Sequence, residues 1–164
     1  MSEEYTEMER EAILQAKKKA LALLEYSDRT EYQLREKLKE GEFPPFAVEE
    51  AVNYVRSFHY IDDERYAENY IRGRKHEKSI YEMTQELRKR GVSDILIEMA
   101  FHAEVPDDFA AAKNLFIKKY GRKDLEDHKV YEKAFRYLAG KGFRYDDIKK
   151  AMEDAVLDLS NGEA

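Results

Sequence analysis

The sequence predicts an all-α protein made of three tandem three-helix repeats that form an elongated, curved array. Three similar segments align on Leu38, Leu87 and Leu138, which lie 49 and 51 residues apart along the chain. Only 7 Gly and 3 Pro occur in 164 residues, and no apolar run shows the period-two alternation of a strand. A repeat of this length is typical of small units that stack, and the long surface of such an array suits binding better than catalysis.

The first repeat is expected to hold three helices with clear start and stop signals. Apolar residues at helical spacing indicate a first helix over about residues 4–26. Thr30 can cap a second helix, which ends at Gly41. Pro44 and Pro45 stand where proline suits the start of a third helix.

The second and third repeats show the same kinds of signal. The second opens at Asp62 and turns near Gly73, and its middle helix is expected over Ser79–Arg90. The third begins at Pro106, and a polar connection over residues 121–128 separates its first two helices. The predicted boundaries are residues 1–60, 61–105 and 106–160 for the three repeats, followed by a C-terminal tail at 161–164.

Composition and charge narrow the class of protein. The chain carries 29 Lys and Arg against 35 Asp and Glu, a net charge of −6, which disfavours tight, autonomous binding to DNA phosphates. The absence of cysteine excludes disulfides and thiolate catalysis and fits a reducing compartment. No apolar run approaches the roughly 20 residues that span a bilayer. The chain begins with an acidic stretch, not a basic leader, so we expect a cytoplasmic protein.

A dense carboxylate cluster occurs at Asp62, Asp63 and Glu64. A metal site or an acid–base pair is one interpretation. The other is helix capping, because Asp at the N-cap accepts backbone N–H bonds and further acids suit the positive end of the helix dipole. Pairs of aspartates also begin the predicted helices at 107–108 and 146–147, and an array has no need of three active sites. We therefore favour capping.

Sequence motifs of catalysis and cofactor binding are missing. The four histidines are scattered without metal-ligand spacing, and no glycine-rich phosphate loop follows a strand. We expect no catalytic residue, no cofactor and no metal, and a protein that is not an enzyme. The twelve tyrosines could stack on nucleic-acid bases, but several fall at helical spacing with apolar residues, which favours core packing.

One segment of the sequence is basic, although the chain as a whole is acidic. Residues 72–90 contain seven Lys and Arg against three Glu, a net charge of +4. Some of these cations lie where they complement the dipole at a helix C-terminus, which is a purely structural explanation. The alternative is a surface that faces an acidic partner or a DNA backbone. The candidate partner-binding residues are Arg65, Arg72, Arg74, Lys75, Arg88, Lys89 and Arg90.

The sequence resembles the RecX family of regulatory proteins. Residues 58–67, FHYIDDERYA, are similar to the family's most recognisable motif, which opens its second repeat. Residues 29–38, RTEYQLREKL, and 86–92, ELRKRGV, resemble two further family segments in the same order. The resemblance extends over about residues 8–158 and includes the three-fold, three-helix organisation.

The resemblance implies a modulator of the RecA recombinase. Members of the family lie in the groove of the RecA–DNA filament and inhibit ATP hydrolysis, strand exchange and co-protease activity. It therefore implies a monomer that binds the RecA filament on DNA, with weak direct DNA contact, in recombination, repair and the SOS response. A sequence-independent DNA-binding protein and a generic helical adaptor are the alternatives.

The sequence departs from the family pattern in two respects. Its net charge is acidic, which argues against direct DNA binding. Glu42 also stands where the other two repeats have Gly91 and Gly142, so we expect a differently shaped turn in the first repeat.

Overall fold

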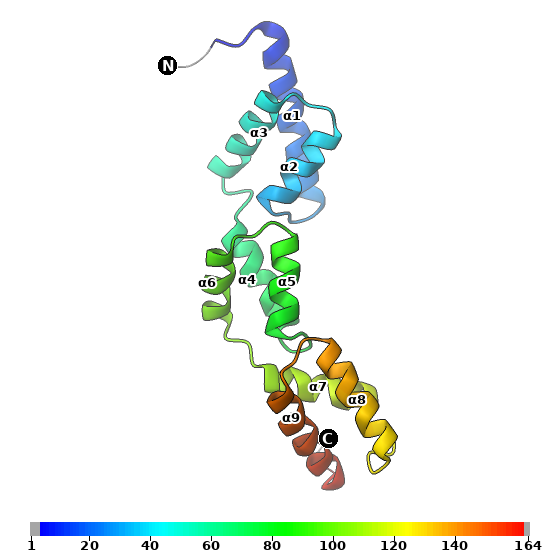
Figure 1. Ribbon diagram of the computed structural model, residues 1–164. Helices are drawn as coiled ribbons and strands as arrows, with labels where there is room; N and C mark the ends of the chain where they lie inside the picture. The colour runs from blue at the N-terminus through cyan, green and yellow to red at the C-terminus, as the bar shows by residue number, and fades with distance from the viewer. Residues whose placement is uncertain (1–3, 163–164) are drawn as a thin grey trace. The chain divides into compact units, whose positions relative to one another are not determined.

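The computed structural model describes residues 4–162, and within them it contains nine α-helices and no strand (Figure 1). The helices are α1 (Glu7–Tyr26), α2 (Glu31–Glu40), α3 (Pro45–Ser57), α4 (Asp63–Arg74), α5 (Ile80–Lys89), α6 (Asp94–Glu104), α7 (Asp108–Tyr120), α8 (His128–Gly140) and α9 (Tyr145–Ser160). The predicted all-α repeat fold is confirmed. No helix in this range is both long and apolar enough to cross a lipid bilayer.

The first repeat comprises α1, α2 and α3, and α1 packs against both of the others. Helix α1 begins at Glu7, three residues later than expected, because Thr6 and Glu9 form a capping box that fixes its start. Helix α2 begins as predicted, with Thr30 as its N-cap and Gln33 completing a second capping box. The buried residues of this repeat form one core: Ile13, Ala16, Ala20, Leu34, Leu38, Ala47, Val48, Ala51, Val52, Val55 and Ile61.

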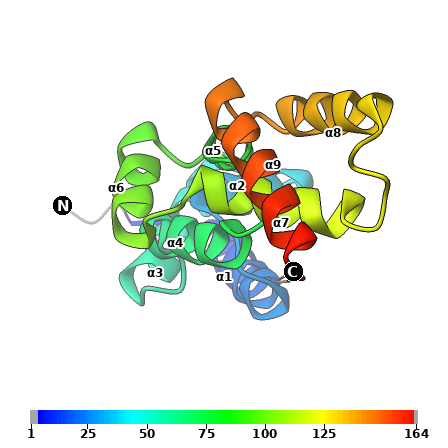
Figure 2. The same ribbon diagram turned by 90° about the horizontal axis from the view of Figure 1, so that it is seen from below.

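The third repeat comprises α7, α8 and α9, and α7 packs against α9 (Figures 1 and 2). The connection between α7 and α8 spans residues 121–127 and forms the open loop that Figure 2 shows in yellow. Helix α9 ends at Ser160, and residues 163 and 164 of the predicted tail lie outside the described range. The core of this repeat contains Ala111, Ala112, Leu115, Phe116, Tyr120, Ala134, Leu138, Phe143, Ile148, Ala151, Met152 and Ala155.

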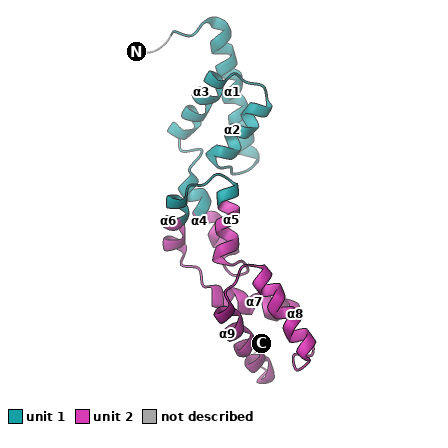
Figure 3. Cartoon of the chain, viewed as in Figure 1, with its two compact units in different colours: residues 1–67, 88–97 teal, residues 68–87, 98–164 magenta. Residues whose placement is uncertain are grey.

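The chain divides into two compact units that differ from the sequence repeats (Figure 3). Residues 1–67 and 88–97 form the first unit, and residues 68–87 and 98–164 form the second. Each of the middle helices α4, α5 and α6 therefore contributes to both units. Each unit thus contains one complete terminal repeat and part of the middle repeat that packs on it.

The turn that follows the second helix has the same backbone conformation in all three repeats. Glu42 has φ 62°, Gly91 has φ 85° and Gly142 has φ 90°, all in the left-handed region. The expectation of a differently shaped turn at Glu42 is therefore wrong. A side chain in this region costs about 1–2 kcal/mol, and the first repeat carries that cost. Glu42 is exposed, so no packing partner demands a glycine there.

We expect Glu42→Gly to raise the free energy of unfolding by about 1 kcal/mol, because glycine adopts a positive φ without steric cost. The midpoint of urea unfolding, followed by circular dichroism at 222 nm, measures the change. Glu36→Gly is the matched control, since it places glycine inside α2 and should destabilise the protein by about 0.5–1 kcal/mol. A midpoint for Glu42→Gly at or below that of the wild type would contradict the strain argument.

Candidate partner-binding surface

The first and second repeats meet through a set of contacts that we call the first joint, formed by Thr30, Glu31, Tyr32, Asp63, Arg90 and Gly91. The buried hydroxyl of Thr30 donates to the carbonyl oxygen of Arg90 at 2.6 Å. The backbone N–H of Glu31 donates to Oδ1 of Asp63 at 2.9 Å. Gly91 lies so close to Tyr32 that an added Cβ would be 2.2 Å from the Tyr32 Cβ.

The second and third repeats meet through equivalent contacts, here called the second joint, formed by Ser79, Ile80, Tyr81, Asp108, Lys141 and Gly142. The hydroxyl of Ser79 donates to the Lys141 carbonyl at 2.6 Å. The Ile80 N–H donates to Oδ1 of Asp108 at 2.9 Å. Gly142 faces Tyr81, and an added Cβ would lie 2.7 Å from the Tyr81 Cδ1. The same side-chain chemistry therefore joins each repeat to the next.

The clustered aspartates have structural roles in this arrangement. Asp62 Oδ1 accepts the N–H of Arg65 at 3.1 Å, as an N-cap does, and Asp107 caps α7 through the N–H of Ala110. The capping interpretation is confirmed for these two residues. The residue after each cap, Asp63 or Asp108, reaches instead to the preceding repeat. The pair at 146–147 lies in the first turn of α9 without capping it.

The two joint carboxylates share an unusual electrostatic environment. Burial raises the pKa of Asp63 above its ordinary value, and the nearby carboxylates of Glu31 and Asp62 add to the effect against the lowering hydrogen bond from the Glu31 N–H. Burial likewise raises the pKa of Asp108. Glu31 is itself bound by the guanidinium of Arg56, and its pKa is lowered: burial raises it, but the hydrogen bond and charge of Arg56 outweigh burial.

We expect Asp63→Asn to stabilise the protein at pH 7 and to lose this advantage as the pH falls. A raised folded-state pKa means that protonation favours folding, so the native Asp63 is fully favourable only below its unfolded pKa, near 3.8, and loses stability as pH rises through the folded pKa. Asparagine keeps the acceptor oxygen without the charge. Urea unfolding of both proteins between pH 4 and pH 7 gives the comparison.

Asp63→Ala is the control for this experiment, because it removes the same titrating carboxyl and also leaves the Glu31 N–H without its acceptor, so it should be less stable than Asp63→Asn by about 1 kcal/mol at every pH. If Asp63→Asn is less stable than the wild type at pH 7, the half-buried charge of Asp63 stabilises the joint and the expectation is wrong.

The predicted partner-binding residues are distributed over both units. Arg65 and the run 88–90 belong to the first unit, and Arg72, Arg74 and Lys75 to the second. Arg65 is exposed, and its side chain makes one long hydrogen bond, 3.3 Å from Nη2 to the carbonyl of His59.

The three cations of the second unit contact neighbouring groups of the same chain. Arg72 donates to Glu104 Oε1 at 2.5 Å, and Lys75 Nζ donates to the Glu104 carbonyl at 2.8 Å. The hydrogen bond from Arg72, with the charge of Lys75, lowers the pKa of Glu104. The guanidinium of Arg74 lies 4.2 Å from the ring centroid of Tyr70. These cations therefore hold the end of α6 and cover a buried tyrosine as well as carrying positive charge.

The cations at the end of α5 differ from one another. Arg88 Nε binds Asp94 Oδ1 at 2.7 Å, which links the end of α5 to the start of α6. Arg90 donates to the Tyr66 hydroxyl at 2.7 Å. Lys89 is exposed and makes no hydrogen bond, ion pair or ring contact with any residue in the range 4–162. Lys89 is thus fully available to a partner.

Sequence reasoning missed several residues that organise this region. Glu104 was not selected, because its two cations lie 29 and 32 positions away. The hydroxyls of Thr30 and Ser79 were not expected to reach the next repeat. A signal for them exists, since Thr30 and Tyr32 recur as Ser79 and Tyr81 at the same 49-residue spacing as the aligned leucines.

Comparisons with known proteins agree with this architecture. Three family models, described as the first, second and third three-helix domains of RecX, match residues 16–54, 62–100 and 106–152. The chain belongs to the RecX family. The three matched segments each fall inside one of the repeat ranges that we propose, 1–60, 61–105 and 106–160.

Curated RecX proteins resemble the chain over most of its length. A protein named Regulatory protein RecX from Vibrio vulnificus is 33% identical over 145 residues, covering 87% of this chain and 94% of its own. A protein of the same name from Clostridium perfringens is 32% identical over 154 residues, covering 92% of this chain and 71% of its own. The chain is accordingly a RecX-family regulatory protein.

Solved RecX structures share the fold. The crystal structure of RecX from Lactobacillus salivarius has a TM-score of 0.73 at 23% identity and covers 90% of this chain and 99% of its own. A second structure, titled as regulatory protein RecX, has a TM-score of 0.75 at 25% identity and covers 93% of this chain and 82% of its own.

Proposed function

We propose that this RecX-family protein regulates the RecA recombinase by binding the RecA–DNA filament. It acts as a non-catalytic monomer in the cytoplasm that occupies the filament groove and inhibits ATP hydrolysis, strand exchange and co-protease activity. The match of all three RecX domains, in order, supports a regulator that uses its whole length. The choice of contact residues depends on which cations in and near the motif at residues 58–67 are exposed.

Part of the motif is committed to the fold. Ile61 and Ala67 are buried, Asp62 caps α4, and Asp63 bonds to the preceding repeat. Tyr66 accepts a hydrogen bond from Arg90 at its hydroxyl. These residues hold the repeats together, whereas Phe58, Tyr60, Glu64 and Arg65 of the motif are exposed.

Arg65 is the one Lys or Arg of the motif, and it is exposed and bound to the chain by a hydrogen bond of 3.3 Å. Lys89 is exposed and has no partner among residues 4–162. We therefore assign Arg65 and Lys89 as the principal cations that contact acidic groups of the filament. The remaining candidates, which also serve internal contacts, contribute less: Arg72, Arg74, Lys75, Arg88 and Arg90.

We expect the double variant Arg65→Ala/Lys89→Ala to need about tenfold more protein for half-maximal inhibition of RecA, since an interface arginine commonly contributes more than 1 kcal/mol to binding. The assay is DNA-dependent ATP hydrolysis by the RecA of the same organism. Stability should be unchanged, because exposed cations of this kind contribute little to folding.

Lys18→Ala/Lys19→Ala is the matched control, because it removes two exposed cations from α1 and changes the net charge equally. Equal inhibition by the two double variants would remove Arg65 and Lys89 from the contact. A wild-type protein that leaves RecA turnover unaltered would instead indicate a generic helical adaptor. DNA binding without RecA, with a steep dependence on salt, would indicate a sequence-independent DNA-binding protein.

A further inference from the structure

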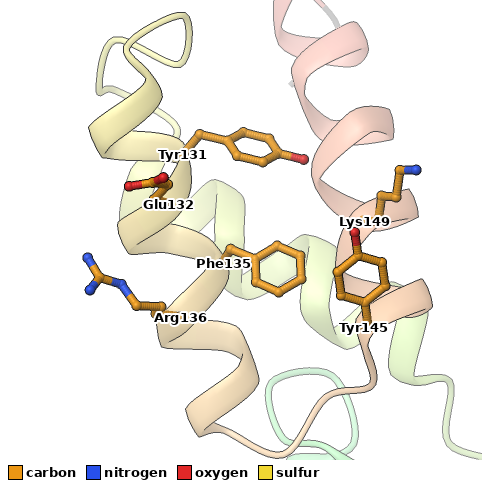
Figure 4. A pocket seen from close by; sticks show the side chains of 6 residues that line it. All are labelled: Tyr131, Glu132, Phe135, Arg136, Tyr145 and Lys149. Atoms are coloured by element: carbon orange, nitrogen blue, oxygen red, sulfur yellow. The ribbon is translucent and has the colours of Figure 1, made fainter.

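An aromatic groove of about 480 Å³ lies between α8 and α9 and is unrelated to either joint. Figure 4 shows the rings of Tyr131 and Phe135 pointing from α8 toward α9, where Tyr145 stands. Its lining residues are Tyr131, Glu132, Phe135, Arg136, Tyr145 and Lys149. The volume falls within the range of about 300–1,000 Å³ that is usual for ligand sites.

The apolar wall of the groove is accessible. The rings of Phe135 and Tyr145 are 5.2 Å apart between centroids and tilted by 56°, so that they form a corner and not a flat shelf. Tyr145 is 64% exposed, although it is among the largest apolar side chains of the unit. An aromatic corner left open to solvent is typical of a place where a partner inserts a side chain.

Of the charged side chains at the groove, the acid has a partner in the part of the chain that the structure describes and the two cations do not. Glu132 is bound by His128, with 2.9 Å between Oε1 and Nε2. Arg136 on α8 and Lys149 on α9 make no hydrogen bond, ion pair or ring contact with any residue of the described chain, 4–162. Figure 4 shows Lys149 on α9, and the Arg136 side chain extending from α8 on the side away from α9. The site therefore offers two cations, and one acid that already contacts His128, around an apolar corner.

We propose that this groove binds a short peptide segment of a partner protein, in which one large apolar side chain is flanked by carboxylates. The apolar side chain packs into the corner of Phe135 and Tyr145, as the anchor residue of an interface does. Arg136 and Lys149 bind the flanking carboxylates, and Arg136 can do so with two parallel hydrogen bonds. The site is distinct from the cations at Arg65 and Lys89, and its test does not involve RecA.

A nucleic acid fits the groove less well than a peptide. Residues 106–164 carry 12 basic and 12 acidic side chains, so the surrounding segment has no net positive charge to attract a polyanion. Helix α9 is itself acidic, with seven residues in its 16 charged and five of them carboxylates: Asp146, Asp147, Glu153, Asp154 and Asp158. A tilted aromatic corner also lacks the parallel ring faces on which successive bases stack.

The experiment measures fluorescence anisotropy of a labelled, end-capped pentapeptide, Asp-Glu-Phe-Glu-Asp, titrated with the full chain. We expect saturable binding that weakens about tenfold or more in Arg136→Glu/Lys149→Glu, because both carboxylate contacts become repulsive. Tyr145→Ala should weaken binding as well, and a peptide with Ala in place of Phe should bind poorly. Circular dichroism verifies that each variant is folded.

Lys133→Glu/Lys150→Glu is the matched control, since it reverses two exposed cations on the same helices outside the groove. Binding that falls equally in both double variants, or no binding of the peptide at all, overturns the proposal. A fifteen-nucleotide oligothymidine is tested in parallel. If it binds more tightly than the peptide and depends on Arg136 and Lys149, the groove is a nucleic-acid site and the peptide proposal is wrong.

Discussion

Replacing Gly91 by alanine is expected to lower the free energy of unfolding by about 3 kcal/mol or more. The new Cβ would lie 2.2 Å from the Cβ of Tyr32, and both atoms are fixed to backbone, so no rotamer change relieves the contact. Overpacking of this kind costs about 1–3 kcal/mol. The φ of 85° adds about 1–2 kcal/mol for a residue with a side chain. Urea unfolding of the purified variant measures the loss.

Gly73→Ala is the matched control for this substitution. Gly73 lies in α4, has no heavy atom within 4 Å of an added Cβ, and does not have a positive φ, so alanine there should stabilise the protein by about 0.5–1 kcal/mol. Gly142→Ala should fall between the two, because it has a similar φ but its closest contacts would be less severe, 2.7 Å to the ring of Tyr81 and 2.9 Å to Oγ of Ser79. A loss below about 1 kcal/mol for Gly91→Ala would mean that the first joint can open without cost.

A double-mutant cycle separates the steric contact with Tyr32 from the effect of the positive φ at residue 91. Tyr32→Gly removes the Cβ that Gly91→Ala would strike. The double variant should therefore lose less stability than the sum of the two single losses, by about 1 kcal/mol or more, as expected for residues in contact. Strictly additive losses would show that the φ of residue 91, and not the contact with Tyr32, is responsible.

The cores of the repeats were predictable from the sequence, because apolar residues at helical spacing form one face of a helix, and that face is buried in the core. Leu38, Leu87 and Leu138 are all completely buried, as their alignment implied. Helix starts were predictable where a residue type has a strong local preference, such as Thr30 at an N-cap and Pro45 in a first turn. Both kinds of signal depend on residues within a few positions of one another.

The joints between repeats were not predictable, because their partners are far apart in sequence. Thr30 reaches a carbonyl 60 positions away, and Ser79 one that is 62 positions away. A backbone carbonyl carries no side-chain signature, so no residue pattern identifies it as an acceptor. Glu42 was misjudged for a related reason: turn geometry is set by the chain on both sides, and glycine is favoured at Gly91 by the close approach of Tyr32 in addition to the positive φ that Glu42 shares.

The cations of the candidate surface were selected by charge alone. Charge does not reveal which of them already form ion pairs or hydrogen bonds within the chain. Arg72 and Lys75 share Glu104, which lies on another helix. Lys89 has the same charge and the same helix-end position as its neighbours, but it is the one left without a contact among residues 4–162. The choice between a structural and a partner-binding cation therefore depends on the fold, and mutational tests should begin with the unengaged residues.

The joint hydroxyl of Thr30 gives the second large effect, and Thr30→Val is expected to lower the free energy of unfolding by about 2–4 kcal/mol. Thr30 is completely buried. Its hydroxyl accepts the N–H of Gln33 at 3.1 Å and donates to the Arg90 carbonyl at 2.6 Å. Valine has the same shape but makes neither hydrogen bond. Losing the helix cap should cost about 1 kcal/mol of stability, and leaving the Arg90 carbonyl without a donor about 1–3 kcal/mol.

Thr30→Ser isolates the role of the hydroxyl, because it keeps both hydrogen bonds and removes one methyl group, at a cost of about 1 kcal/mol. Ser79→Ala in the second joint removes the equivalent pair of bonds, to the Glu82 N–H and the Lys141 carbonyl. It should therefore be destabilising to a similar degree, by about 2–4 kcal/mol. If Thr30→Val were as stable as Thr30→Ser in urea, the hydroxyl would not hold the first and second repeats together, and shape alone would explain the joint.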